Sequence, residues 1–187
     1  MNSIAKKLTN YIYHKGLIEE EYFDVYQYGF ECFLEISINF ISCIIIGLSL
    51  HMLLECLIFF FFFIPLRSYS GGLHMSTYML CYILSCLIVI VSLLIVKNIS
   101  LPAYVSFLIY LLSAIFLHLI GPVDHPNREV DAEDNQKFMK KANITILIGG
   151  ICAIIFLIAH MYPYLLLEAL VYMIVLITSF IGKLIYK

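Results

Sequence analysis

Long apolar runs separated by short polar segments dominate this chain and constrain its fold more than any other feature. Of its 187 residues, 63% are hydrophobic and only 13% are charged. A soluble domain of this length cannot cover so much apolar surface, and soluble monomers rarely expose contiguous apolar patches beyond several hundred Å². The composition therefore predicts an all-α, polytopic integral membrane protein. The apolar runs cover residues 33–51, 52–66, 75–96, 100–120, 142–161 and 163–182.

These runs predict about six transmembrane helices. A helix needs roughly 20 apolar residues to cross the hydrocarbon core, with a range near 17–25. The run over 52–66 is shorter than this and ends in the sequence LIFFFFFIP. A tilted or extended helix accommodates such a run, and so does a re-entrant hairpin, so both interpretations stay open. Pro65 is expected to end this helix, because its ring cannot continue the hydrogen-bond ladder.

The N-terminal residues have a different pattern, in which lysines alternate with apolar residues at helical spacing. This pattern predicts an amphipathic helix lying in the membrane interface, with a plain cytoplasmic tail helix as the alternative. The chain length fits a single domain over 1–187, with an amphipathic, cytoplasmic arm over 1–28 and a transmembrane bundle over 29–187. The apolar residues of the expected arm helix are Ile4, Leu8, Tyr11 and Ile12.

The basic residues indicate the orientation in the membrane. If the N-terminus is cytoplasmic and six helices span, all of the eleven Lys and Arg residues except Lys97 fall on the cytoplasmic side. Cytoplasmic segments of membrane proteins typically carry such an excess of basic residues. We therefore expect both termini, and the segment 67–74, at the cytoplasmic face. No basic cluster that would follow a phosphate backbone is present in the sequence, which argues against a nucleic-acid partner.

The six cysteines lie mostly inside apolar stretches, where Cys behaves as a small hydrophobic residue. No CxxC pair and no HExxH motif occurs, so we expect reduced thiols, no metal site and no cofactor. Glu31 and Glu35 approach the first span. Carboxylates at membrane depth are costly and tend to face a polar cavity, so these two are candidates for supporting an active site.

The segment Arg67–Cys81, RSYSGGLHMSTYMLC, is a polar island between two apolar runs. Gly71 and Gly72 provide backbone freedom, and their N–H groups are candidate oxyanion donors. His74 is a candidate base for the thiol of Cys81, which becomes a good nucleophile only as the thiolate. Seven residues on one helix correspond to about 10.5 Å along its axis. We therefore expect His74 on a loop before the helix, curling toward Cys81, or a pair that closes when substrate binds.

This segment resembles the signature of the AgrB family, the membrane cysteine endopeptidases of Gram-positive quorum sensing. The family pattern has an Arg, a Gly-Gly-x-His and a Cys seven residues after the His. Arg67, Gly71, Gly72, His74 and Cys81 occupy all of these places. A second stretch, GPVDHPN over 121–127, resembles a loop of clostridial-type members, and the similarity in length, span count and charge pattern extends over essentially the whole chain.

The resemblance implies a cell-membrane enzyme of a Gram-positive bacterium that cleaves an AgrD-like propeptide near its C-terminus. It implies Cys81 as the nucleophile that forms a thioester and His74 as the base, followed by ring closure to a thiolactone or lactone. Arg67 is expected to bind the acidic tail or carboxylate of the propeptide, or else to be a positive-inside anchor. Asp124 and His125 are candidates for a third, orienting member of the site, or else form a Pro-bounded turn.

Two other classes of function stay open. A small peptide transporter or export channel would use the Gly-Gly loop as a hinge, although the two halves show no clear internal symmetry. A non-enzymatic membrane scaffold or sensor is the third alternative. A homodimer is also expected, because small residues allow close helix contact. The residues that motivate the dimer are Gly47, Ser85 and Gly149–Gly150.

Overall fold

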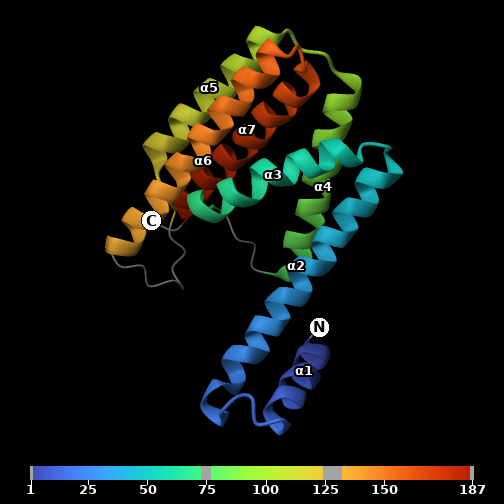
Figure 1. Cartoon of the computed structure of the whole chain (residues 1–187), viewed down its shortest axis with the longest axis vertical. Coiled ribbons are helices and arrows are strands. Elements are labelled where there is room, and N and C mark those ends of the chain that lie inside the picture. The colour runs from blue at the N-terminus through green and yellow to red at the C-terminus, as the bar shows by residue number, and fades with distance from the viewer. Residues whose placement is uncertain (1, 73–76, 124–131, 186–187) are drawn as a thin grey trace.

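The computed structural model describes residues 2–72, 77–123 and 132–185, and within these ranges the chain is all-α (Figure 1). Six helices, α2 to α7, are long and apolar enough to cross a membrane. The predicted class is therefore confirmed, including the additional helix before the spans. The elements are α1 (Asn2–His14), the short 3-10 helix η1 (Glu20–Tyr22), α2 (Phe23–Ser49), α3 (Leu53–Ser70), α4 (Tyr78–Asn98), α5 (Ala103–Ile120), α6 (Ala132–Ile158) and α7 (Tyr162–Ile185).

Helix α7 is the centre of the bundle. It packs against α3, α4, α5 and α6, and Figure 1 shows it beside α5 and α6 with α3 crossing it. The rest of the protein buries 61% of the membrane span of α7, against 11% of the span of α2. Because lipid is as apolar as Leu, helices associate in a bilayer through close packing and polar contacts rather than through hydrophobicity. α7 therefore organises the bundle, whereas α2 presents most of its surface to the surroundings.

Helix α3 differs from the sequence prediction at its C-terminal end. Pro65 was expected to end the helix, but α3 continues without interruption to Ser70, with Pro65 in its interior. Proline removes one backbone donor, and helices within a membrane bundle tolerate this loss because neighbouring groups satisfy the freed carbonyl. The continuation gives α3 18 residues, or about 27 Å, which matches a thin hydrocarbon core. The re-entrant alternative is therefore not required.

Helix α1 packs along the N-terminal half of α2 (Figure 1). The contact uses small residues one turn apart, since Ala5 and Thr9 are fully buried. Ile4, Leu8 and Tyr11 are exposed, so protein does not cover the apolar face. This arrangement leaves that face available for the expected contact with lipid. Helix α2 begins at Phe23, within the range expected for the arm.

The small residues that suggested a dimer are used inside this one chain. A Cβ atom on Gly47 would lie 2.8 Å from Cβ of Cys56, so the glycine allows α2 and α3 to approach closely. A Cβ atom on Gly149 would collide with the Tyr172 side chain of α7. Ser85 lines a cavity between α2, α3 and α4. The dimer therefore stays a prediction that these residues no longer support.

Candidate active site

The Gly-Gly motif and the GPV motif lie side by side at one end of the bundle. The amide of Val123, just after α5, donates to the carbonyl of Ser70 at the end of α3, at 3.0 Å. Gly71 and Val123 form a parallel bridge. The two stretches are separated in sequence by two whole helices, and only the fold brings them together. Their junction is the first element of the candidate site.

Glycine is required at both positions of the Gly71–Gly72 pair, which lies between α3 and α4. Gly71 has φ 69° and Gly72 has φ 138°, in the region that side-chain-bearing residues rarely adopt. A Cβ atom at Gly71 would also collide with the backbone carbonyl of Val123, and one at Gly72 with the guanidinium of Arg67. The pair therefore combines an unusual backbone shape with close approach to two neighbours.

Arg67 holds this loop from the last turn of α3. Its half-buried guanidinium donates a hydrogen bond from Nη1 to the carbonyl of Gly71. The hydroxyl of Ser179, on α7, donates to the same carbonyl at 3.4 Å. The amide of Gly71 is itself bonded to the carbonyl of Arg67, at 3.1 Å. Of the two amides considered as oxyanion donors, that of Gly71 is therefore already engaged, which leaves Gly72.

The end of α7 also fastens the loop that follows α5. Lys183 donates from Nζ to the carbonyl of Ile120, at 2.7 Å. A cation at a helix C-terminus interacts favourably with the unpaired carbonyls and the helix dipole. Together, Ser179 and Lys183 attach both motif loops to the central helix.

Cys81 lies in the first turn of α4. Its amide donates to the carbonyl of Thr77 at 3.2 Å, and its own carbonyl accepts from the hydroxyl of Ser85 at 2.8 Å. The residue is half-buried and its thiol is free. The positive end of a helix dipole stabilises a thiolate, so this is a favourable place for a nucleophilic cysteine. Residues 73–76, between Gly72 and Thr77, lie outside the described residues.

The two glutamates of α2 lie along the helix that pairs with α4. The hydroxyl of Tyr78 donates to the backbone carbonyl of Glu35 at 3.3 Å, which places Glu35 beside the turn that carries Cys81. Glu31 accepts from the side-chain amide of Gln27 at 3.4 Å. Both glutamates are half-buried. Glu35 is therefore positioned near the candidate site, and Glu31 lies one turn further toward the N-terminus of α2.

Three predicted site residues, His74, Asp124 and His125, lie outside the described residues. The described residues that flank them are Gly72 on one loop and Val123 on the other. Among the described residues, no hydrogen bond joins Cys81 to either glycine of the pair. The expected Cys81–His74 pair therefore stays a prediction.

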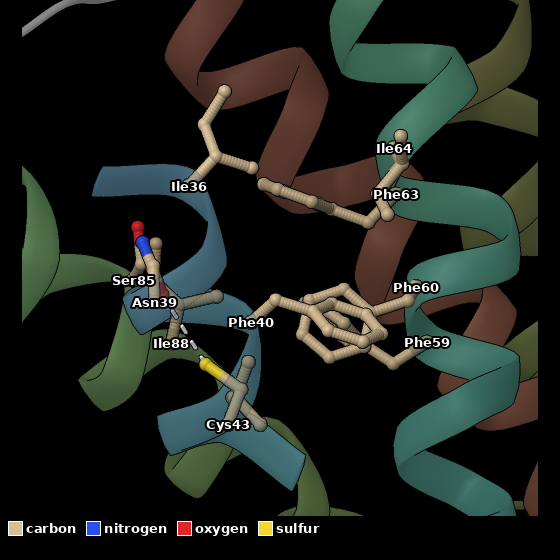
Figure 2. Close-up of a pocket in the computed structure, with 11 residues that line it drawn as sticks. Ile36, Asn39, Phe40, Cys43, Phe59, Phe60, Phe63, Ile64, Ser85 and Ile88 are labelled. Carbon is tan, nitrogen blue, oxygen red and sulfur yellow. Dashed lines mark hydrogen bonds between the residues drawn. The ribbon is translucent and has the colours of Figure 1, made fainter. Parts of the chain in front are cut away.

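A cavity of about 200 Å³ lies between α2, α3 and α4, one helical turn deeper than Cys81 (Figure 2). Ser85 belongs to its wall and bonds to the Cys81 carbonyl, so the cavity begins next to the cysteine. Figure 2 shows Phe40 of α2 beside the phenylalanines of α3, with its ring centroid 5.1 Å from that of Phe60. The wall is apolar except for Asn39 and Ser85, with Oδ1 of Asn39 accepting from the Cys43 thiol at 3.4 Å. The other lining residues are Ile36, Phe40, Phe59, Phe60, Phe63, Ile64, Ile88 and Val89.

Sequence reasoning missed this cavity. The structure divides the run Phe59–Phe63 between different environments. Phe61 is 59% exposed, Phe62 is buried, and Phe59, Phe60 and Phe63 line the cavity. A continuous run of one residue type has no periodicity that would reveal its inner face. The isolated Asn39 within an apolar helix was the one available signal.

The fold and this site define a polytopic, all-helical membrane protein with a free cysteine at one end of its bundle, beside an apolar cavity. The sequence matches the family model of AgrB, accessory gene regulator B, over residues 5–182, and the chain belongs to this family. Membership associates it with the accessory gene regulator system and, in general terms, with processing of the AgrD propeptide.

Two relatives from Clostridium perfringens support this assignment. The chain is 29% identical over 154 residues to an AgrB-like protein 2 of strain 13 (type A), and the match covers 79% of this chain and 72% of the relative. An AgrB-like protein of strain SM101 (type A) matches with the same identity and coverage. No solved structure matches the chain significantly.

Proposed function

We propose that this protein is a membrane-embedded cysteine endopeptidase that cleaves the C-terminal part of an AgrD-like propeptide through a Cys81 thioester. It then promotes ring closure to a thiolactone or lactone autoinducer for quorum sensing. The observation that carries the proposal is the junction of the two motif loops at the end of the bundle where α4 presents Cys81. Family membership gives the substrate class.

The first step forms the thioester. His74 takes the proton of the Cys81 thiol, and the thiolate attacks the carbonyl carbon of the scissile peptide bond. The C–N bond then breaks, and the departing amine takes the proton from the His74 imidazolium. The amide of Gly72 is the candidate donor to the transient oxyanion. Its conformation depends on Arg67, which fixes the Gly71 carbonyl.

The second step closes the ring. A cysteine or serine side chain within the acylated peptide attacks the thioester carbonyl and loses its proton to His74. The Cys81 sulfur leaves as the thiolate and takes the proton from the His74 imidazolium, so the enzyme returns to its starting state. A thioester conserves much of the acyl-transfer potential that the ring closure requires. Exclusion of water favours attack by the peptide over hydrolysis, and a site bordered by apolar helices provides this.

The apolar cavity is proposed to bind the apolar part of the propeptide next to the scissile bond. Ser85 of its wall lies one turn from Cys81, so a peptide anchored among the phenylalanines of that cavity is proposed to keep its carbonyl near the sulfur. Asn39 and Ser85 are the polar groups available to orient a peptide backbone.

The remaining candidates have supporting roles in this proposal. Asp124 or His125 orients His74, and Arg67 has a positioning role in addition to the expected binding of the acidic tail of the propeptide. Glu35 and Glu31 contribute negative charge along α2. We place the site at the cytoplasmic face of the cell membrane, with both termini cytoplasmic, and a homodimer as the assembly. The partners are the propeptide and the lipid bilayer.

The test compares two cysteines of the same helix. The chain is co-expressed with an AgrD-like propeptide, and propeptide size is followed by mass spectrometry. Cys81→Ala is expected to abolish cleavage, while Cys86→Ala, which alters another half-buried thiol on α4, leaves it intact. His74→Ala is expected to prevent accumulation of the thioester between Cys81 and the cleaved peptide, which hydroxylamine would release. Normal processing by Cys81→Ala would overturn the peptidase and favour the transporter alternative.

A further inference from the structure

A carboxyl group lies in the second turn of α7, which has the most buried membrane span among the described helices. Glu168, on α7, has an exposed fraction of 0%. Within the part of the chain that the structure describes, neither of its carboxyl oxygens has a hydrogen-bond partner. An unpaired buried carboxyl group is costly in an apolar interior and, within a membrane span, is generally functional. The proposed peptidase makes no use of it.

The surrounding helices leave room for this group. The Gly149 position, on α6, faces the Tyr172 hydroxyl and Oε1 of Glu168, and a Cβ atom there would lie 3.1 Å from that oxygen. A Cβ atom on Gly150 would lie 3.4 Å from the hydroxyl of Tyr110, on α5. The rings of Tyr110 and Tyr172 meet edge to face, with centroids 4.8 Å apart. Three helices therefore build one polar cluster inside the bundle.

The hydrogen-bond directions in this cluster determine what Glu168 encounters. The hydroxyl of Tyr172 donates to the carbonyl of Thr145 at 3.3 Å, and that of Tyr110 donates to the carbonyl of Ile146 at 3.2 Å. A hydroxyl has a single hydrogen, so both tyrosines present oxygen lone pairs to the rest of the cluster. A carboxylate would therefore find no tyrosine hydrogen to accept in this cluster.

No described cation compensates a negative charge at this position. The titratable groups that face Glu168 are Tyr110 from α5, Cys152 from α6 and Tyr172 from its own helix. Helices α3 and α4 also pack against α7, and none of their described titratable groups interacts with the carboxyl. All of these partners are neutral when protonated, so the cluster has no counter-ion for an ionised Glu168.

We propose that Glu168, Tyr110 and Tyr172 form an intramembrane proton-binding site, in which the Glu168 carboxyl group holds one proton at neutral pH. The bound proton neutralises the carboxyl group and so removes the cost of a buried charge. The site is separate from the Cys81 segment, and it does not depend on the proposed peptidase activity.

Infrared spectroscopy of the purified protein in lipid bilayers tests the proposal directly. The wild-type protein at neutral pH is expected to show the carbonyl band of a protonated carboxylic acid. Glu168→Gln removes this band, whereas the matched control Glu55→Gln, at the half-buried start of α3, keeps it. Glu168→Asp retains a band at a shifted position. Absence of the band from the wild type, or its persistence in Glu168→Gln, would overturn the proposal.

Thermal unfolding over a pH series gives an independent readout. The folded protein holds a proton that the unfolded chain releases above the ordinary range of a carboxyl group, so stability is lost as pH rises. Glu168→Gln is neutral at every pH, so it is expected to flatten this dependence, unfolding near the wild-type temperature at acidic pH and above it at neutral pH. An equal slope in both proteins would contradict the proposal. So would stabilisation by Na⁺ that the Gln variant lacks, because it would indicate a bound cation in place of the proton.

Discussion

The two Gly-Gly pairs of this protein have the same sequence but different structural roles. Gly71–Gly72 lies in a loop at the end of the bundle, with both φ values positive and with Val123 and Arg67 in close approach. Gly149–Gly150 lies within α6, where its missing side chains make room for two tyrosine hydroxyls and a carboxyl group. The first pair shapes the backbone of the candidate active site, and the second accommodates a polar cluster in the core. A dipeptide therefore does not define a role until its neighbours are known.

The largest effect is expected from Gly71→Ala. The added Cβ atom meets the Val123 carbonyl and carries the strain of a positive φ, so the junction of the two loops has to separate. We expect propeptide processing to fall by at least about tenfold, which corresponds to about 1.4 kcal/mol. The assay is the time course of propeptide cleavage in membranes.

Gly16→Ala is the matched control for this substitution. Gly16 has the same φ of 69°, and nothing lies within 4 Å of its added Cβ atom. It therefore carries the backbone strain, roughly 1–2 kcal/mol, without the collision. Equal losses of activity in the two variants would show that strain alone, and not the loop junction, matters for processing.

An intermediate effect is expected from Gly149→Ala, and it concerns stability. The Cβ atom collides with the Tyr172 side chain, and overpacking of this kind costs about 1–3 kcal/mol. Gly29→Ala, on α2 with nothing within 4 Å, is expected to be neutral or stabilising by up to about 1 kcal/mol. Thermal unfolding in detergent or bilayers measures both variants.

A double-mutant cycle sharpens this second prediction. Tyr172→Phe removes the hydroxyl that occupies the space at Gly149, so the cost of Gly149→Ala should become smaller in that background. An unchanged cost would mean that another neighbour, and not the hydroxyl, requires glycine at this position.

The smallest effect is expected from Ser179→Ala, which removes one contact between α7 and the Gly71 loop. The bond is long, at 3.4 Å, and Arg67 donates to the same carbonyl. The free energy of unfolding should fall by at most about 0.5–1.5 kcal/mol. Propeptide processing should decrease modestly. Thr178→Ala, whose hydroxyl bonds within α7 to Val175, is the control. A loss of processing as large as that of Gly71→Ala would place Ser179 within the chemistry of the site.

The spans illustrate how far sequence reasoning extends. Hydropathy and length predict α2 to α7 correctly, because every membrane-crossing helix has to be long and apolar. Hydropathy does not distinguish α2 from α7, since their spans have mean hydropathies of 2.0 and 2.3 and very different burial. The prediction that α3 ends at Pro65 was wrong for a related reason. Whether a proline ends a helix depends on the groups around it, and the sequence of α3 alone does not specify them.

The candidate site shows the same division. The motif predicts Cys81, His74, Arg67 and the Gly-Gly pair, and their proposed roles stay to be tested by substitution. The contact between Gly71 and Val123 was not predicted, because it joins segments on either side of α4 and α5. The Phe-lined cavity and the Glu168 cluster were missed as well. Each is built from side chains of three helices, and no single stretch of sequence contains either one.

By itself, the sequence determined that the chain is a bundle of about six membrane helices, because only helices satisfy their backbone groups locally in lipid. It also determined the residue types available for thiol chemistry at one end of that bundle. Tertiary structure alone decided that α7 lies at the centre, that two distant loops meet beside it, and that a carboxyl group is enclosed with no counter-ion among the described residues. The physical reason is that helix packing in a bilayer depends on the fit of small and polar residues, which hydropathy does not encode.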